Sequence, residues 1–202
     1  MLNSFVLKKP IALIFTVLVV DQALKFWIKS TKKLEWTENI FDLEWFRITF
    51  IENPGMAFGM QFGGDWGKYL LSILRIIAIC GIAWYLYRLV NENTQKGVIM
   101  SVALVLAGAI GNMIDSAFYG MIFSSSEGQI ATLFEGGYAG FLQGRVVDMF
   151  YFPIIENGRF PDWVPIWGGD DFTFFKYVFN IADAAISVGV ANLLIFHRNF
   201  FK

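Results

Sequence analysis

The sequence has very little of the two side chains that most often bind metals or form catalytic triads, with one cysteine and one histidine in 202 residues. Cys80 lies within an apolar run, and a single thiol excludes an internal disulfide, a CxxC redox pair and a cysteine metal cluster. With His197 as the only histidine, a histidine metal site or a Ser-His-Asp triad is also difficult to assemble. We therefore expect no metal and no organic cofactor, and any chemistry must depend mainly on carboxylates.

The sequence also lacks an excess of positive charge, with 16 lysines and arginines against 17 acids. Proteins that bind nucleic acid need a basic surface, so we expect no nucleic-acid partner. By contrast, 56% of the residues are hydrophobic, whereas soluble domains have roughly 45–50% apolar residues. The composition therefore predicts a mainly α integral membrane protein, with residues 1–202 forming a single membrane domain.

Four apolar segments are long enough to be transmembrane helices, at about residues 11–28, 69–90, 97–118 and 173–196. Two long segments, 29–68 and 119–172, connect them on one side of the membrane. Four spans place both termini on the other side, where the short segments carry six lysines and arginines against one acid, Glu92. By the positive-inside rule that side is cytoplasmic, so we expect the two long segments to be periplasmic.

The first apolar segment begins after two lysines with a ten-residue run, Ile11–Val20, which has the length of a signal-peptide h-region. No small-residue cleavage site follows, and the segment reaches the ~20 residues of a span when it continues through Asp21. We interpret it as a transmembrane helix in which Asp21 and Lys25, four residues apart, share a face and can pair. The next segment, Asp42–Glu52, is rich in strand-forming residues and predicts a small sheet outside the membrane.

Polar side chains inside the predicted spans are the main functional signal. A carboxylate at the centre of a bilayer costs ~2.5–3.5 kcal/mol on insertion scales. Asp183 lies about eleven residues into the fourth predicted span, so we expect a partner or a function that offsets this cost. Asn112 and Asp115 share one face of the third span with Gly108, which favours contact with a neighbouring helix. The topology puts five polar side chains in the outer half of the membrane: Asp21, Asn112, Asp115, Asn180 and Asp183.

Asp148 lies in the second long segment, at the expected mouth of the membrane region, where it can approach Asp183. Two carboxyl groups within a few ångströms do not readily ionise together, so they share one proton. The ionised member can take a proton from water while the protonated member donates to a carbonyl oxygen. The two residues thus have the chemistry of aspartyl peptide hydrolysis.

The same residues have other interpretations. Asp148 alone is typical of a solvated loop acid, Asp21 of an ion-pair partner, and Asn112 of a hydrogen bond between helices. A small four-helix transporter or proton-relay protein that uses Asp21, Asp115 and Asp183 stays open as an alternative, as does a structural membrane scaffold. Replacing Asp148 separates these classes, because a relay would depend far more on Asp183.

Five short motifs occur in order along almost the whole chain. They are Asp21 with Lys25, Asn53-Pro54-Gly55-Met56-Ala57-Phe58, Gly108–Asp115, Val146-Val147-Asp148 and Phe179-Asn180-Ile181-Ala182-Asp183. In this order, and on a four-span topology, the chain resembles the lipoprotein signal peptidases (signal peptidase II), the intramembrane aspartyl proteases of bacteria.

The resemblance implies that Asp148 and Asp183 are the catalytic pair. The implied substrate is a prolipoprotein with a diacylglyceryl group on its lipobox cysteine, which the enzyme cleaves just before that cysteine. Seven further residues are implied to bind substrate or support the site: Asp21, Lys25, Asn53, Gly55, Asn112, Asp115 and Asn180. Membrane lipids and globomycin-like peptide inhibitors are the other implied partners, and the bacterial inner membrane is the implied location.

The chain departs from the family pattern at two places. Many members have an arginine directly after the third-motif aspartate, where this chain has Ser116. Arg145, three residues before Asp148, can instead offer a positive charge to a lipid headgroup or the substrate. The outer segments 119–147 and 149–171 are also longer than expected. The expected fold is thus four transmembrane helices with a small periplasmic β-cradle and an extended periplasmic loop.

Overall fold

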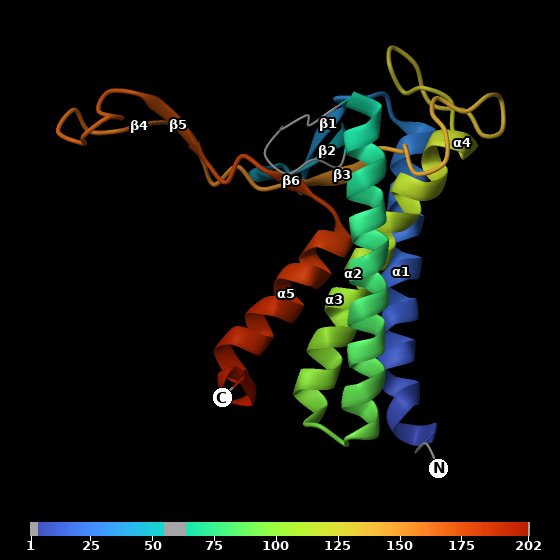
Figure 1. The fold of residues 1–202 in the computed structure, drawn as a ribbon. Helices are drawn as coiled ribbons and strands as arrows, with labels where there is room; N and C mark the ends of the chain where they lie inside the picture. Colours follow the sequence, from blue (N-terminus) through green and yellow to red (C-terminus); the bar gives the residue numbers. More distant parts are fainter. Residues whose placement is uncertain (1–3, 55–63, 202) are drawn as a thin grey trace.

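The computed structural model describes residues 4–54 and 64–201, and its main feature is a bundle of long helices (Figure 1). These helices are α1 (Ser4–Thr31), α2 (Gly64–Asn91), α3 (Lys96–Ile114) and α5 (Ile181–Phe196). A π-helical turn, Asp115–Tyr119, and the short α4, Gly120–Ile122, continue α3, while a 3₁₀ turn, Arg198–Phe201, follows α5. The start of α1 and the end of α5 lie at the same end of the bundle (Figure 1).

Among the described residues, three helices are long and apolar enough to cross a membrane: Leu7–Thr31, Trp66–Asn91 and Lys96–Ile122. The structure thus confirms helices at the first three predicted spans. The prediction of a fourth helix that starts near residue 173 was wrong, because residues 171–174 and 178–179 are strands and α5 begins at Ile181. Asp183 therefore lies in the first turn of α5 and not eleven residues below its start.

A small antiparallel sheet covers the end of the bundle opposite the termini (Figure 1). Its strands are β1 (Thr37–Ile40), β2 (Leu43–Asn53), β3 (Val146–Tyr151) and β6 (Val178–Phe179), in the order β1-β2-β3-β6. Strand β2 contains all of the predicted strand segment except Asp42, so the expectation of a small sheet is confirmed. A separate hairpin, β4 (Ile155–Arg159) with β5 (Asp171–Phe174), extends sideways from this end of the molecule (Figure 1).

Helix α3 is the central helix, and glycines bring its neighbours close. It packs on α1, α2 and α5. Half of its apolar 18-residue stretch is buried, against 17% of the corresponding stretch in α1 and 11% in α2. A Cβ at Gly108 would collide with the Ala182 carbonyl oxygen of α5, and one at Gly189 would lie 2.7 Å from the Ser101 oxygen of α3. Small residues at such crossings permit close backbone approach between membrane helices. The predicted contact of the Gly108 face with a neighbouring helix is therefore confirmed.

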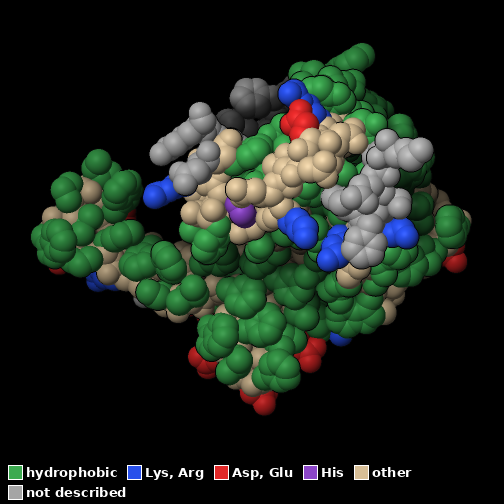
Figure 2. Space-filling model, turned by 90° about the horizontal axis from the view of Figure 1, so that it is seen from below, with side chains coloured by type: hydrophobic (Ala, Val, Ile, Leu, Met, Phe, Trp, Pro, Cys, Tyr) green, Lys and Arg blue, Asp and Glu red, His purple; other side chains and the backbone are tan. Residues whose placement is uncertain are grey.

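The end of the bundle at which the termini lie carries the basic side chains. Figure 2 looks onto this end and shows several lysine and arginine side chains around it, beside the single histidine. The acid Glu92 lies here too, in an exposed ion pair in which Arg88 Nε is 2.6 Å from Glu92 Oε1. The candidate functional residues, among them Asp148 and Asp183, lie at the opposite end of the bundle, where the sheet meets α1, α3 and α5.

Candidate active site

Strand β3 carries Asp148 into the junction between the sheet and the helices. The pairing of β2 with β3 sets Ile51 opposite Asp148 and Asn53 opposite Val146. Asn53 Nδ2 donates to Asp148 Oδ2 at 3.3 Å, and Asn180 Nδ2 donates to Asp148 Oδ1 at 2.7 Å. Asp148 is only 3% exposed, so this carboxyl is a buried group held by two amides and not a solvated loop acid.

Asp183 reaches the same junction from the first turn of α5. Asn180 is the N-cap of this helix and forms a capping box with Asp183, in which each side chain accepts from the other's backbone N–H. The Asn-x-x-Asp spacing explains why α5 begins here, because the cap satisfies amides that a helix leaves free at its start. Asn112 Nδ2 of α3 donates to Asp183 Oδ1 at 2.7 Å.

Asn180 therefore contacts both aspartates at once. Its Nδ2 donates to Asp148, and its Oδ1 accepts from the Asp183 backbone N–H at 2.9 Å. Burial and the negative charge of Asp183 together raise the pKa of Asp148 to about 7, against the opposing effects of the Asn53 and Asn180 hydrogen bonds and the charge of Lys25. Asp148 is thus a carboxyl that holds its proton close to neutral pH beside a second carboxyl group.

A buried ionic cluster around Lys25 fixes the elements that carry the pair. We call it the Lys25 cluster: Asp21, Gln22, Lys25, Asn112 and Asp115. Lys25 Nζ lies 2.9 Å from a carboxylate oxygen of Asp21 and 2.9 Å from one of Asp115, and all three side chains are fully buried. The predicted Asp21–Lys25 pairing is confirmed.

Each acid of the Lys25 cluster also holds a backbone amide next to one of the two aspartates. Asp21 Oδ1 accepts from the Ala182 N–H at 2.9 Å, directly before Asp183. Asp115 Oδ2 accepts from the Val147 N–H at 3.1 Å, directly before Asp148. The cluster thereby positions β3 and the start of α5 relative to α1 and α3.

Several polar contacts at this end were not predicted. Gln22 donates to Asp115 Oδ1 at 2.9 Å and accepts from the Tyr119 hydroxyl at 3.2 Å. Lys29, fully buried, forms an ion pair with Glu52 and donates to Ser126 Oγ at 2.9 Å. The spacing Asp21, Lys25, Lys29 along one helical face was the available signal, since such residues lie one above the other.

The structure shows what surrounds Arg145, and what contacts Ser116, the position where the resemblance led us to expect an arginine. The Arg145 guanidinium lies 3.0 Å from Glu127 and 3.5 Å from Glu52, so it joins the Lys29 contacts. Ser116, which stands in place of the expected arginine, accepts a hydrogen bond at 3.3 Å through its Oγ from Arg75 Nη1 of α2. Arg75 also interacts electrostatically with Asp183. Gly55, the remaining predicted site residue, lies outside the described residues, as do Met56, Ala57 and Phe58.

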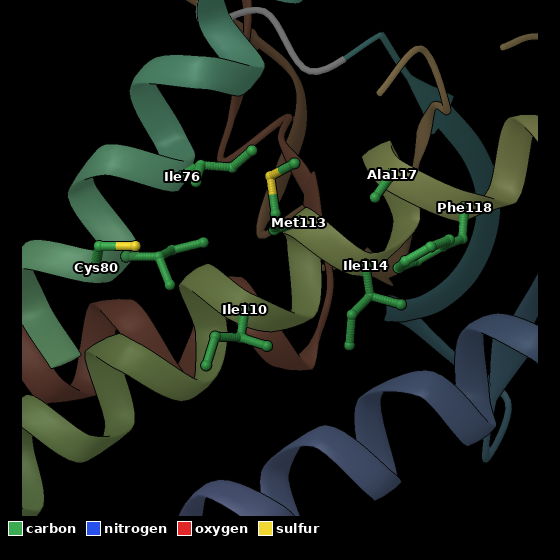
Figure 3. Close-up of a pocket in the computed structure, with 8 residues that line it drawn as sticks. Ile76, Cys80, Ile110, Met113, Ile114, Ala117 and Phe118 are labelled. Carbon is green, nitrogen blue, oxygen red and sulfur yellow. The ribbon is translucent and has the colours of Figure 1, made fainter. Parts of the chain in front are cut away.

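An apolar pocket between α2 and α3 is chemically unlike this junction (Figure 3). Figure 3 shows its lining side chains, which come from these two helices and the turn after α3. Cys80 is the only thiol at the pocket, and the other lining groups are hydrocarbon, a thioether and an aromatic ring. The side chains that line this pocket carry no charge, whereas the junction of β3 with α5 holds Asp148 and Asp183.

Comparisons with known proteins agree with this architecture. The profile of the signal peptidase (SPase) II family matches residues 13–199. The lipoprotein signal peptidase of Porphyromonas gingivalis is 50% identical over 187 residues, which are 91% of this chain and 80% of that protein. The lipoprotein signal peptidase of Amoebophilus asiaticus is 40% identical over 182 residues, 89% of this chain and 73% of that protein.

Solved structures add a likeness of fold. Two structures described as bacterial membrane enzymes solved by the in meso method, at 1.9 and 2.3 Å resolution, match with TM-scores of 0.60 and 0.59 and 22% sequence identity. The matches cover 93% and 95% of this chain, and 91% and 88% of those chains. The family profile and the relatives above lead to one assignment, and the solved structures agree with it in fold. This chain belongs to the signal peptidase II family of membrane proteases.

Proposed function

We propose that the chain is an aspartyl endopeptidase that removes the signal peptide from diacylglyceryl-modified prolipoproteins, cleaving before the lipidated cysteine. Family membership supports the reaction and its substrate class. The observation that carries the assignment of Asp148 and Asp183 is Asn180, whose single side chain contacts both residues at a buried junction. Two carboxyl groups held in this way can share one proton, as the hydrolysis of a peptide bond without a covalent intermediate requires.

In the proposed mechanism Asp183 is the base and Asp148 the acid. Asn112 Nδ2 donates a hydrogen bond to Asp183 Oδ1 and so orients this carboxyl group as the proposed acceptor of a proton from water. Asp148, with its pKa raised to about 7, carries its proton in about half of the molecules at neutral pH. Asp183 takes a proton from water while the water oxygen bonds to the scissile carbonyl carbon and Asp148 protonates the carbonyl oxygen. As the C–N bond breaks, the leaving nitrogen receives the proton from Asp183, and a hydroxyl of the intermediate returns a proton to Asp148.

The supporting residues would act by position. In this proposal Asn53, Asn112 and Asn180 orient the two carboxyl groups, while the Lys25 cluster fixes β3 against α5. Gly55 and Arg145 are proposed to contact the substrate or its lipid. A globomycin-like peptide would inhibit by occupying the space between the two aspartates.

The proposed topology has four spans in the bacterial inner membrane, with α5 as the fourth. The basic side chains around the end that carries the termini support a cytoplasmic position for that end. The sheet would then be a periplasmic cradle, and the aspartates would lie near the periplasmic face. The segment between α3 and α5 would form the extended periplasmic loop.

Cleavage of a purified diacylglyceryl prolipoprotein tests the proposal. Asp148→Asn and Asp183→Asn should each abolish cleavage while the protein keeps its folded, monodisperse state in detergent. Glu38→Gln, which removes an exposed acid on β1, is the matched control and should cleave normally. Normal cleavage by Asp148→Asn would overturn the pair. If Asp183 proved essential for proton flux through vesicles while Asp148 was dispensable, the relay alternative would be favoured instead.

A further inference from the structure

The β4–β5 hairpin extends away from the rest of the fold. We call residues 154–177 the arm. Its two strands pair only with each other in the sheet topology, and the arm extends sideways at the level of the sheet, roughly perpendicular to the long helices (Figure 1). In this position it overhangs the flank of the bundle on which α5 lies (Figure 1).

The arm exposes many large apolar side chains. Eight of them are at least 44% exposed: Ile154, Ile155, Trp163, Ile166, Trp167, Phe174, Phe175 and Tyr177. Trp163 at 81% and Ile166 at 89% are almost as accessible as in an extended chain. Burying such side chains is favourable, and an exposed apolar patch of this size indicates an interaction surface.

The apolar side chains cover the side of the arm that faces along the bundle. Figure 2, seen from the end at which the termini lie, shows this side of the arm on the left. Hydrophobic side chains cover nearly all of it, and acidic groups lie at its edge (Figure 2). Since the helices cross the membrane in that same direction, the apolar side of the arm faces the surface of the bilayer next to α5.

The arm has internal packing that gives this surface a defined shape. Phe160 packs on Phe172 with ring centroids 4.5 Å apart and on Trp167 at 6.4 Å. At the base, Arg47 of β2 makes two hydrogen bonds with Glu156, at 2.9 and 2.7 Å. An isolated two-stranded hairpin is marginally stable in water, so these contacts and a further surface are needed to hold the arm in place.

The tip of the arm has a conformation that is unfavourable for the residue it contains. Ile166 has φ +75°, in the left-handed region, where a β-branched residue is an outlier. Glycine or asparagine adopts such a backbone readily, whereas isoleucine adds strain to near-complete exposure. The strained backbone therefore presents an apolar side chain at the outer surface of the tip.

The charge of the arm indicates which apolar surface it fits. It carries four acids and two basic residues, so an anionic lipid surface would not attract it by charge. Its two tryptophans and one tyrosine are residues that favour the headgroup layer, where an apolar ring and a polar group are both accommodated. A partner protein would also fit an aromatic surface, but a bilayer surface is already brought to this side of the arm by the spanning helices.

We propose that the arm is a membrane-contacting element, which rests its apolar side in the headgroup layer of the leaflet nearest the sheet. The binding depends on aromatic and aliphatic burial and not on anionic lipid. This inference requires that the helices span the membrane, but it does not rest on the proposed proteolysis. It gives the long segment between β3 and α5 a role of its own.

Spin labels in the full-length chain test the proposal in phosphatidylcholine nanodiscs. A nitroxide is attached at Ile166→Cys in a Cys80→Ser background, and its collision rates with oxygen and with a water-soluble nickel chelate are compared. Oxygen is concentrated in the lipid and the chelate in water, so oxygen should dominate at position 166. Asp170→Cys, an exposed acid on the same arm, is the matched control, where the chelate should dominate.

Two results would overturn the proposal. Equal access of the nickel chelate to positions 166 and 170 would leave the arm in water. Shielding of position 166 from both reagents, with spin–spin broadening that disappears on dilution with unlabelled protein, would show a second copy of the chain on the arm. A further check replaces part of the phosphatidylcholine with phosphatidylglycerol, which should leave the oxygen preference unchanged. Cleavage activity is not part of the readout, so failure here would leave the proposed protease intact.

Discussion

Two lysines one helical turn apart on α1 are both fully buried, and their surroundings differ in charge. Lys25 pairs with Asp21 and Asp115, so this cluster has more acid than base. Lys29 pairs with Glu52, and Arg145 contacts both Glu52 and Glu127, so two cations meet two acids around Lys29. We call Lys29, Glu52, Ser126, Glu127 and Arg145 the Lys29 cluster.

The difference shows how one helix face can serve two purposes. The Lys29 cluster joins the first long segment to the second through Glu52 and Ser126, and a balanced set of charges suits a purely structural connection. The Lys25 cluster lies next to Asp148 and Asp183, where burial and the charge of Asp183 raise the pKa of Asp148 and the charge of Lys25 opposes the rise. A proton on Asp148 relieves the cost of a buried charge beside Asp183, and in the proposed mechanism it is the proton that acid catalysis uses.

Asp148→Asn should give the largest contrast between the two regions, because it removes the titrating proton. Cleavage should fall by roughly 10²–10⁴-fold, the usual contribution of general acid–base catalysis. The free energy of unfolding, by contrast, should be higher for Asp148→Asn than for the wild type at neutral pH, because the variant has no buried carboxyl group to ionise. An unfolded carboxyl titrates near 3.8 and the folded one at a pKa of about 7, so the folded wild type binds more protons in between and loses stability as pH rises through this window.

Thermal unfolding in detergent between pH 4 and pH 8 measures this loss of stability. The melting temperature of the wild type should fall over that range relative to Asp148→Asn, which lacks the titrating group. At pH 4 the two proteins should differ little. Parallel curves across the range would contradict the assignment of a raised pKa to Asp148.

Lys25→Met should be the next largest effect and the most destructive for the fold. It leaves Asp21 and Asp115 buried without their cation, and removing one partner of a buried ion pair costs about 3–5 kcal/mol. Cleavage should be lost as well, because β3 and α5 lose their common anchor. Lys9→Met, the same change at an exposed position of α1, is the control and should leave the unfolding temperature within error.

Lys29→Met should be milder, which sharpens the comparison directly. Glu52 keeps Arg145 and Ser126 as partners, so the expected cost is about 1–3 kcal/mol for an incompletely satisfied buried group. Cleavage by the folded protein should continue with an unchanged pH profile. A larger loss of activity than in Lys25→Met would mean that the two clusters do not divide their roles in this way.

Asn180→Ala should have the smallest effect on stability and a specific effect on titration. Loss of the helix cap costs about 1 kcal/mol. The Asn180 hydrogen bond lowers the pKa of Asp148, so its removal should raise that pKa and shift the alkaline limb of the cleavage profile to higher pH. Asn192→Ala, which removes a 2.7 Å hydrogen bond to Ser101 farther along α5, should cost stability without moving that limb.

Much of the helical part of the fold could be predicted from residue patterns. The first three spans follow from length and hydrophobicity, and the Asp21–Lys25 pair follows from helix periodicity. The start of α5 was misplaced because residues 172–179 are nearly all apolar or aromatic, and such a run fits strand or helix equally well. The Asn180–Asp183 capping box was the local signal that could have corrected it.

The site was only partly predictable for a related reason. Lys29 and Glu52 are 23 residues apart, and Arg75 and Ser116 are 41 apart, so only folding shows that they meet. Arg145 was expected near lipid or substrate, yet Glu52 and Glu127 lie within ion-pair distance of it. No local pattern distinguishes these partners, because any acid on a neighbouring segment could satisfy the same arginine.

The sequence by itself indicated a membrane protein and predicted chemistry that depends on carboxylates, since hydrophobic runs must be buried and a chain with one cysteine and one histidine offers few other reactive groups. The tertiary structure decided which carboxylates lie near one another and how burial and neighbouring groups raise the pKa of Asp148. Asp148 and Asp183 lie 35 positions apart, and their association depends on a strand register, a helix cap and a lysine on α1. Ionisation of a buried acid depends on the charges and amides around it in space, which the order of residues along the chain does not specify.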